Sequence, residues 1–207
     1  MSQYFQIHPE TPQTRLVRRT VEILRRGGLI VYPTDSTYAL GCCMGEKEAV
    51  DRIRRIRDLN DRHNFTLACR DLSDIGTYAK VENNAFRLLK AHTPGPYTFI
   101  LPATGEVPRR LQHPKRKTIG IRVLANRVAQ AILDELGEPL MTTSLLLPGD
   151  ELPMTDPELI RERIGRVVDA VVDGGPGGME PSTVVDLTGE VPGVVREGAG
   201  DPSVFES

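Results

Sequence analysis

Two arginines lie within otherwise apolar segments of the sequence. Arg122 belongs to the run Ile119-Gly-Ile-Arg-Val123, and Arg196 belongs to Val194-Val-Arg-Glu-Gly198. A guanidinium that a strand carries into the interior needs a partner, because an unpaired buried charge is very costly. Its planar group of donors suits a carboxylate or a phosphate. Both segments therefore indicate a site that binds an anion.

Hydroxyl-bearing residues cluster in two segments that suit such a site. The run Pro33-Thr-Asp-Ser-Thr-Tyr38 joins one expected strand to the next, and Thr142-Thr-Ser144 lies at the end of another. Ligands of open α/β sheets usually bind at loops that follow strands. Ordinary turn chemistry explains the residues of the first run equally well. Together with the two arginines, these runs predict an anion-binding concavity in which no general base or nucleophile stands out.

Other residues argue against several common kinds of site. The four histidines, at positions 8, 63, 92 and 113, show neither an HxxxH spacing nor a pairing with cysteine, so we expect no metal cage made by protein side chains. The sequence has no nucleophile elbow, Walker loop or dinucleotide-binding glycine motif. Residues 174–178 are glycine-rich, but they join two expected strands, which favours a flexible loop over a phosphate cradle.

Basic residues gather in two further segments. The members are Arg52, Arg54, Arg55 and Arg57 in an expected helix and Arg109, Arg110, Lys115, Arg116 and Lys117 in an expected loop. A solvated helix face, balanced by neighbouring aspartates, explains the first group without any ligand. If both groups lie on one surface, they predict a polyanion contact that weakens with salt, because each phosphate contact releases counterions.

Composition and charge set the class of protein. The chain has 207 residues, of which 39% are hydrophobic and 26% charged, as is typical of a soluble globular domain. Its net charge of −2 conceals an asymmetry: residues 1–130 carry 22 basic and 12 acidic side chains, whereas residues 131–207 carry 4 and 16. A basic segment of this kind favours a polyanionic partner.

Targeting signals and cysteine usage indicate the compartment. No apolar run approaches the roughly 20 residues that span a bilayer, so we expect no membrane partner. The N-terminus shows no secretory signal, and Cys42, Cys43 and Cys69 form neither an even set nor a CxxC pair. These features predict a cytoplasmic location. The absence of Trp argues against large stacking platforms for single-stranded nucleic acid.

Periodicity predicts the elements that must position these residues. The first helix is expected to have Thr11 as its N-cap and Pro12 in its first turn, and to end at Gly27. Other helices are expected at residues 46–57, 83–92, 126–136 and 157–164, and strands at 29–32, 37–43, 65–69, 97–101, 118–123, 140–144, 170–172, 182–187 and 194–196. This alternation predicts one α/β domain over residues 1–207 with a mixed sheet, a core at about residues 12–200 and short terminal extensions.

These segments, in this order, resemble the YrdC-like family and most closely its YciO branch. The matching pieces are Leu29-Ile-Val-Tyr-Pro-Thr-Asp-Ser-Thr-Tyr-Ala-Leu-Gly41, Pro94-Gly-Pro-Tyr-Thr-Phe-Ile-Leu101, Ile119-Gly-Ile-Arg-Val123, Thr142-Thr-Ser144, Ser182-Thr-Val-Val-Asp-Leu187 and Val195-Arg-Glu-Gly198. The resemblance implies a single-domain, twisted and open mixed sheet flanked by helices, with a basic central cavity.

The family's best-known activity converts L-threonine, bicarbonate and ATP into threonylcarbamoyl-AMP and pyrophosphate, for the threonylcarbamoyladenosine modification of tRNA. Members are also described as binding double-stranded RNA. The ligands implied are ATP with Mg²⁺, threonine, bicarbonate and RNA, without a tightly bound prosthetic group. A carbamate oxygen attacks the α-phosphate, so the protein supplies alignment and positive charge, and no catalytic residue is needed.

The resemblance also assigns residues. Thr34 and Tyr38 would line a threonine pocket, and Arg122 would bind the substrate carboxylate. The complete set implied for substrate and nucleotide is Thr34, Tyr38, Arg57, Arg122, Thr142, Ser144, Ser182 and Arg196. The two basic segments, rather than the resemblance, supply the RNA-binding candidates, which are Arg52, Arg54, Arg55, Arg109, Arg110, Lys115, Arg116 and Lys117.

Two departures from the synthase pattern bear on activity. Synthase members carry Lys-x-Arg where this chain has Arg57-Asp58-Leu59, and Ser-x-Asn where it has Ser144-Leu145-Leu146. Losing a charge-assisted contact costs about 1.5–3 kcal/mol, so two losses slow a reaction by several powers of ten.

Three interpretations follow. The chain is a YciO-type nucleotide- and RNA-binding protein with weak or altered synthase activity, an active synthase, or a non-catalytic RNA-associated protein. The departures favour the first or the third, and the retained arginines and hydroxyls argue against a vestigial cavity.

Overall fold

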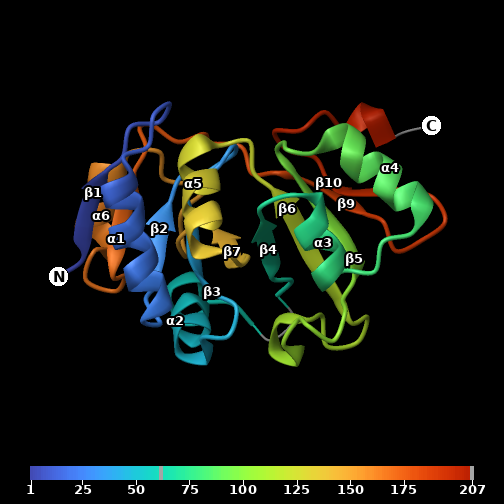
Figure 1. Ribbon diagram of the computed structural model, residues 1–207, viewed down its shortest axis with the longest axis horizontal. Coiled ribbons are helices and arrows are strands. Elements are labelled where there is room, and N and C mark those ends of the chain that lie inside the picture. The colour runs from blue at the N-terminus through green and yellow to red at the C-terminus, as the bar shows by residue number, and fades with distance from the viewer. Residues whose placement is uncertain (61–62, 206–207) are drawn as a thin grey trace.

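The computed structural model, which describes residues 1–60 and 63–205, contains ten strands that form one sheet (Figure 1). The strands are β1 (Gln3–Gln6), β2 (Ile30–Tyr32), β3 (Ala39–Cys43), β4 (Thr66–Cys69), β5 (Tyr97–Pro102), β6 (Thr118–Val123), β7 (Leu140–Ser144), β8 (Ala170–Asp173), β9 (Thr183–Asp186) and β10 (Gly193–Arg196). The helices are α1 (Thr14–Arg25), α2 (Lys47–Arg57), α3 (Leu72–Tyr78), α4 (Asn83–His92), α5 (Arg127–Leu136) and α6 (Pro157–Ile164), with 3-10 turns η1 (Arg109–Leu111) and η2 (Pro202–Phe205).

The order of the strands is β1-β8-β2-β3-β7-β4-β6-β5-β9-β10. β8 pairs in parallel with both β1 and β2, and the pairs β4–β6 and β5–β9 are also parallel. The remaining neighbours are antiparallel, including β9 and β10. The predicted mixed sheet in a single α/β domain is therefore confirmed.

Helices cover both faces of the sheet. α1 and α5 pack over one face, and α2, α3, α4 and α6 pack over the other. Because the sheet twists, Figure 1 shows α1 and α5 in front of its left half and α3 and α4 in front of its right half. Two apolar layers result, one on each side of a sheet whose central strands are buried.

The first helix begins later than predicted. Its buried positions are Val17, Thr20, Val21 and Leu24. The residue that precedes its first turn is Gln13, whose backbone oxygen accepts hydrogen bonds from the following turn. The prediction that Thr11 is the N-cap was wrong. The Thr11 hydroxyl lies 3.0 Å from Nδ1 of His8 and forms a hydrogen bond within the turn that precedes the helix.

Three further features differ from the prediction. β1 pairs with β8 and buries Phe5, so the first residues belong to the sheet and are not an extension. α3 was not predicted; Asp71 caps it by accepting backbone hydrogen bonds from the first turn. β3 begins at Ala39 and not at 37, because the Thr37 carbonyl accepts a hydrogen bond from the Thr34 hydroxyl at 2.5 Å.

None of the helices in residues 1–60 and 63–205 has the length and apolar character to cross a bilayer.

The register of the central strands gathers polar side chains on one face. Arg122 on β6 lies opposite Ala68 on β4, and Thr98 on β5 lies opposite Val184 on β9. Side chains alternate between the two faces of a strand. The alternate residues of β4, β5 and β6 belong to the apolar layer under α3 and α4. Thr98 and Arg122 therefore point away from those helices.

Candidate functional site

A cavity of about 280 Å³ opens on that polar face of the sheet. It is lined by His63, Asn64, Thr66, Thr98, Ile100, Gly120, Arg122, Thr142, Thr143, Ser144, Ser182, Val184, Val195 and Arg196. Five of the eight predicted ligand residues lie in this lining, namely Arg122, Thr142, Ser144, Ser182 and Arg196. A Cβ at Gly120 would lie 2.6 Å from Oγ1 of Thr66, so glycine keeps this part of the cavity open.

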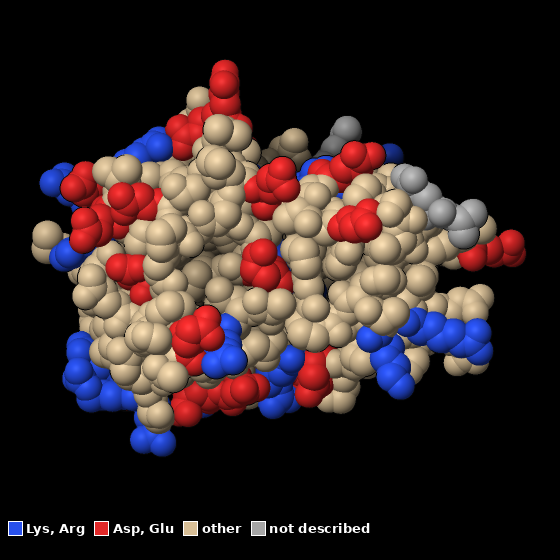
Figure 2. Space-filling model, turned by 90° about the horizontal axis from the view of Figure 1, so that it is seen from above, with Lys and Arg blue, Asp and Glu red and all other residues tan. Residues whose placement is uncertain are grey.

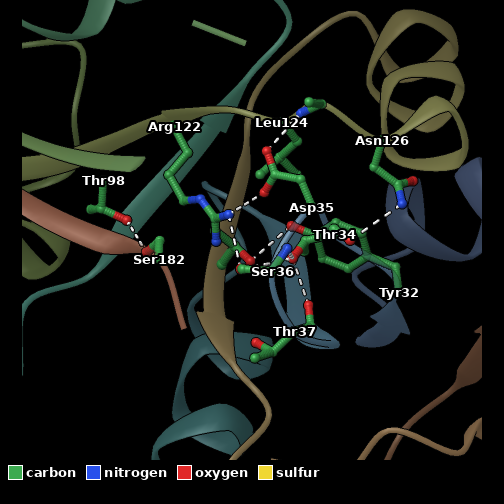
Figure 3. A network of polar contacts seen from close by, with 12 residues as sticks. Tyr32, Thr34, Asp35, Ser36, Thr37, Thr98, Arg122, Leu124, Asn126 and Ser182 are labelled. Atoms are coloured by element: carbon green, nitrogen blue, oxygen red, sulfur yellow. Dashed lines mark hydrogen bonds and ion pairs between the residues drawn. The ribbon is translucent and has the colours of Figure 1, made fainter. Parts of the chain in front are cut away.

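Arg122 is held by the loop after β2. Its Nη2 donates to Oδ1 of Asp35 at 2.5 Å and to Oγ of Ser36 at 3.1 Å (Figure 3). The second carboxylate oxygen of Asp35 accepts from the N–H of Ala125 at 2.8 Å, just before α5. Arg122 is 5% exposed, and its Nε has no partner among the described residues. Asp35 and Ser36 were not predicted as site residues, although they stand inside the hydroxyl-rich run.

The same loop uses Thr34 to fix its own shape. The Thr34 hydroxyl lies 3.2 Å from Oγ of Ser36, and its oxygen accepts from the Ser36 N–H at 3.1 Å. Nδ2 of Asn126 donates to the Thr34 carbonyl at 3.3 Å (Figure 3). Thr34 is absent from the described lining of the cavity, so its expected contact with threonine stays a prediction.

Arg196 and Ser182 form a second polar wall. Nη2 of Arg196 donates to the Ser182 carbonyl at 2.7 Å, and the Ser182 hydroxyl lies 2.7 Å from that of Thr98. Burial lowers the pKa of Arg196, and the nearby charge of Arg122 lowers it further. The contacts that Arg196 makes with described residues are to neutral oxygens.

Arg57 reaches the edge of the cavity from the opposite face of the sheet. Its Nη1 donates to the Thr143 hydroxyl at 3.1 Å and to the Ser144 carbonyl oxygen. Burial lowers the pKa of Arg57, and its buried Nε has no partner among the described residues. Arg57 therefore supports the end of β7 from behind, and a direct contact with a ligand stays a prediction.

Thr142 is fixed by neighbours. It accepts from the Tyr32 hydroxyl at 2.8 Å and donates to the Leu40 carbonyl at 3.2 Å. Burial raises the pKa of Tyr32 to about 12, so this hydroxyl keeps its proton.

Tyr38 points away from the cavity toward residues 174–178. Its hydroxyl donates to the Gly175 carbonyl at 2.6 Å and accepts from the Gly174 N–H at 3.1 Å. Burial raises the pKa of Tyr38 to about 12. Tyr38 is absent from the described lining of the cavity, so its expected place in a threonine pocket stays a prediction.

His63 lines the cavity but was not predicted. Its Nε2 lies 3.4 Å from the Thr143 hydroxyl, and its ring packs edge-on against Phe65. Burial, and then the charges of Arg57 and Arg54, lower the pKa of His63 to about 4. The imidazole is therefore neutral at pH 7. A lone histidine without a ligand spacing carries no sequence signal, so only the fold reveals it.

The two predicted basic groups lie beside each other. Nη2 of Arg110 in η1 donates to the carbonyl of Gly45, just before α2, at 2.8 Å, and Nη2 of Arg54 in α2 donates to the Arg110 carbonyl at 3.5 Å. Within residues 1–60 and 63–205, Arg52 forms an ion pair with Asp169 and Arg116 forms one with Asp186. The exposed candidates are Arg55, Arg109, Arg110, Lys115, Arg116 and Lys117. We call α2 together with residues 109–117 the basic end of the molecule, at the bottom of Figure 1.

The opposite end has a different charge pattern. Figure 2 shows that end, with acidic side chains over the middle of the face and basic side chains mostly along its margins. Charge is therefore distributed unevenly over a single domain.

Metal and thiol chemistry have little support in the described part of the chain. Residues 1–60 and 63–205 contain no group of three His, Cys, Asp or Glu side chains that could hold a metal ion. The three cysteines are buried and free, and burial raises the pKa of Cys42 and Cys43 to about 12. These thiols are therefore protonated at neutral pH.

The sequence and the structure of the chain are both similar to those of the same group of known proteins. Residues 22–198 match the Sua5_yciO_yrdC family model, described as telomere recombination. The protein YciO of Escherichia coli (strain K12) is 59% identical over 205 residues, which cover 99% of this chain and 100% of YciO. The crystal structure of E. coli YciO has a TM-score of 0.96 to this chain, with the same coverage.

More distant relatives have described activities or ligands. The threonylcarbamoyl-AMP synthase of Halorhodospira halophila (strain DSM 244 / SL1) is 31% identical over 170 residues, covering 82% of this chain and 88% of the synthase. The crystal structure of P. abyssi Sua5 complexed with L-threonine is 25% identical, with a TM-score of 0.90. It is matched over 98% of this chain and 59% of Sua5.

Proposed function

Because this chain belongs to the Sua5/YciO/YrdC family, we propose that it is a nucleotide- and RNA-binding protein with weak or altered threonylcarbamoyl-AMP synthase activity. The observation that carries the proposal is the pair of guanidinium groups, Arg122 and Arg196, in one cavity of about 280 Å³. Asp35 neutralises the first, whereas Arg196 contacts neutral oxygens among the described residues. One positive charge is thus available to an anionic ligand.

The cavity suits a phosphate-bearing ligand. Arginine forms strong, directional hydrogen bonds with phosphate oxygens. The hydroxyls of Ser144 and Ser182 lie in the same lining, beside the apolar side chains of Ile100 and Val184. A nucleotide offers both charged and apolar parts to such a surface. Mg²⁺ would arrive with ATP and neutralise part of its charge, and the protein's own part is to bind and align the phosphates.

Leu59, at one of the two departures from the synthase pattern, supports the proposal of weak activity. Leu59 follows Asp58, which has a left-handed backbone conformation (φ 51°), and the Leu59 N–H donates to the Arg54 carbonyl at 2.9 Å. Together with the Asp58 N–H bond to the Arg55 carbonyl, these contacts form a Schellman C-cap. Leu59 also packs against the apolar core. Position 59 therefore closes a helix with an apolar side chain where synthases carry arginine.

The basic end supports the RNA part of the proposal. The Arg54 bond to the Arg110 carbonyl joins α2 to the 109–117 loop, and Arg110 also bonds the residues just before α2, so their basic side chains share one surface. Such a surface attracts the phosphate backbone without reading base sequence. Double-stranded RNA or tRNA is the expected partner, which implies a cytoplasmic location.

The deciding experiment combines binding with turnover. Purified protein is mixed with Mg-ATP, L-threonine and bicarbonate, and pyrophosphate release and adenylate formation are measured beside the H. halophila synthase. We expect ATP binding with turnover at least about 100-fold below that enzyme, equivalent to roughly 2.7 kcal/mol in the barrier. We expect Arg196→Met to abolish ATP binding, and Arg166→Met, at an exposed position, to preserve it.

Other outcomes select the other interpretations. Turnover equal to that of the synthase would make the protein an active enzyme of tRNA modification and overturn the proposal of weak activity. RNA binding without any ATP or threonine binding would identify a non-catalytic RNA-associated protein.

A further inference from the structure

The glycine-rich residues 174–178, here called the glycine segment, pack directly on the loop that holds Arg122. A Cβ at Gly178 would lie 2.1 Å from the Ser36 carbonyl oxygen, and a Cβ at Gly177 would lie 2.6 Å from the Tyr38 ring. A Cβ at Gly174 would lie 2.7 Å from Cγ of Pro33. Cβ contacts below 3.0 Å are essentially never found, so each substitution must displace a neighbour. At Gly178 that neighbour is backbone, which no side-chain rotation can move.

The glycine segment is fixed at its other side. Oδ1 of Asp173 accepts from the Gly175 N–H at 2.9 Å, and Oδ2 of the same carboxylate accepts from the Tyr4 hydroxyl at 2.7 Å. The Gly177 N–H donates to the Thr155 carbonyl at 2.8 Å. Gly175 has a φ of 94°, a backbone conformation that residues with a side chain rarely adopt. The segment is therefore held by hydrogen bonds on one side and by the 33–38 loop on the other, whereas the sequence favoured a flexible loop.

The position of the 33–38 loop determines the position of the Arg122 guanidinium in the cavity. Asp35 and Ser36 are the described partners of Arg122, and both belong to this loop. If the loop shifts outward, the Arg122 guanidinium loses its contacts at 2.5 and 3.1 Å. Arg122 lines the cavity, whereas Asp35 and Ser36 are absent from the described lining. The orientation of the Arg122 guanidinium therefore depends on residues outside the lining.

We propose that Gly177 and Gly178 are positioning residues of the ligand cavity, acting through the 33–38 loop on Arg122. This inference rests on the proposed function, because it takes the cavity as the ligand site. It assigns a role to a segment that is absent from the described lining of the cavity. The required property is the absence of a side chain at both positions.

The test compares Gly178→Ala and Gly177→Ala with Gly105→Ala, where an added Cβ meets no atom within 4 Å. ATP and L-threonine binding are measured by calorimetry, and amide hydrogen exchange is followed by mass spectrometry. The exchange probes are the N–H groups of Ser36 and Ala125, which donate to Thr34 and Asp35. The reference amides are those of β5, which a local shift leaves protected.

We expect Gly178→Ala to accelerate exchange at both probes and weaken ligand binding by about tenfold or more, with β5 unchanged. Gly105→Ala should match the wild type. Binding and probe exchange like those of Gly105→Ala would overturn the proposal, and so would uniformly faster exchange throughout the chain, which indicates a purely structural role.

A second variant covers the case in which Gly178→Ala does not fold. Tyr38→Phe removes the hydrogen bonds to Gly174 and Gly175 but keeps the ring. We expect faster exchange at the two probes for this variant, and unchanged probe exchange would count against the proposal. If the wild type binds neither ligand, the proposed function fails, while the exchange comparison still decides whether the glycine segment positions the loop.

Discussion

Asp35 and Arg122 form a buried ion pair, with Oδ1 and Nη2 2.5 Å apart and both side chains 6% exposed. Their positions in the chain differ by 87 residues. The pair joins the loop after β2 to the C-terminal end of β6, and the Ala125 N–H extends it toward the start of α5. Arg122 is therefore held in place before any ligand arrives.

Breaking this pair should destabilise the fold. Asp35→Asn leaves Arg122 as an uncompensated buried charge, and losing one partner of such a pair costs about 3–5 kcal/mol. We expect a fall of that order in the free energy of unfolding, measured by urea denaturation. The double variant Asp35→Asn/Arg122→Met should be much less destabilised than the sum of the two single variants, because the orphaned charge is gone. If the decrease in the free energy of unfolding of the double variant equals the sum of the two single decreases, the two side chains are not coupled.

The sequence predicts some residues of this site and misses others, and the difference has physical reasons. An arginine within an apolar strand is a local signal, and alternation puts Arg122 and Thr98 on one face once the strands are paired. Its partner Asp35 was not predicted because a loop contact over 87 positions depends on the strand order. β1 was missed because four residues with one buried side chain carry little periodicity. Tyr38 was placed at the cavity by resemblance, whereas its hydroxyl bonds the glycine segment.

His63 should make stability depend on pH. Its pKa in the folded chain is about 4, below the ordinary value of 6.5, so between these values the unfolded chain binds more protons. The free energy of unfolding should therefore decrease as pH falls from about 6.5 to about 4, by roughly 1–3 kcal/mol from this group.

The effect of His63 is separable from that of titrating carboxylates. His63→Gln should remove only this part of the pH dependence of the free energy of unfolding. An NMR titration of the ring protons gives the pKa directly. A value near 6.5 for His63 would contradict the prediction.

Restoring the synthase pattern should raise activity at some cost in stability. We expect Leu59→Arg with Leu146→Asn to increase adenylate formation by at least about tenfold, since each restores a polar ligand contact. Leu59 closes α2 and packs on the core, so Leu59→Arg alone should lower the free energy of unfolding by roughly 1–2 kcal/mol. Leu152→Arg, at a 62% exposed position, is the control for added charge. No gain in rate would mean that the site differs from a synthase at more than these positions.

RNA binding at the basic end should depend strongly on salt. The logarithm of the affinity for duplex RNA should fall linearly with the logarithm of salt concentration, because bound phosphates release counterions. Arg109→Gln/Lys115→Gln removes two exposed charges from the 109–117 loop, so the magnitude of the slope should decrease by about 1.8, at about 0.9 per contact. Arg87→Gln/Lys90→Gln removes the same charge at exposed positions of α4, which lies away from the basic end (Figure 1). Equal decreases in the two variants would show that net charge alone governs binding, and a flat response in the wild type would remove the basic end as an RNA site.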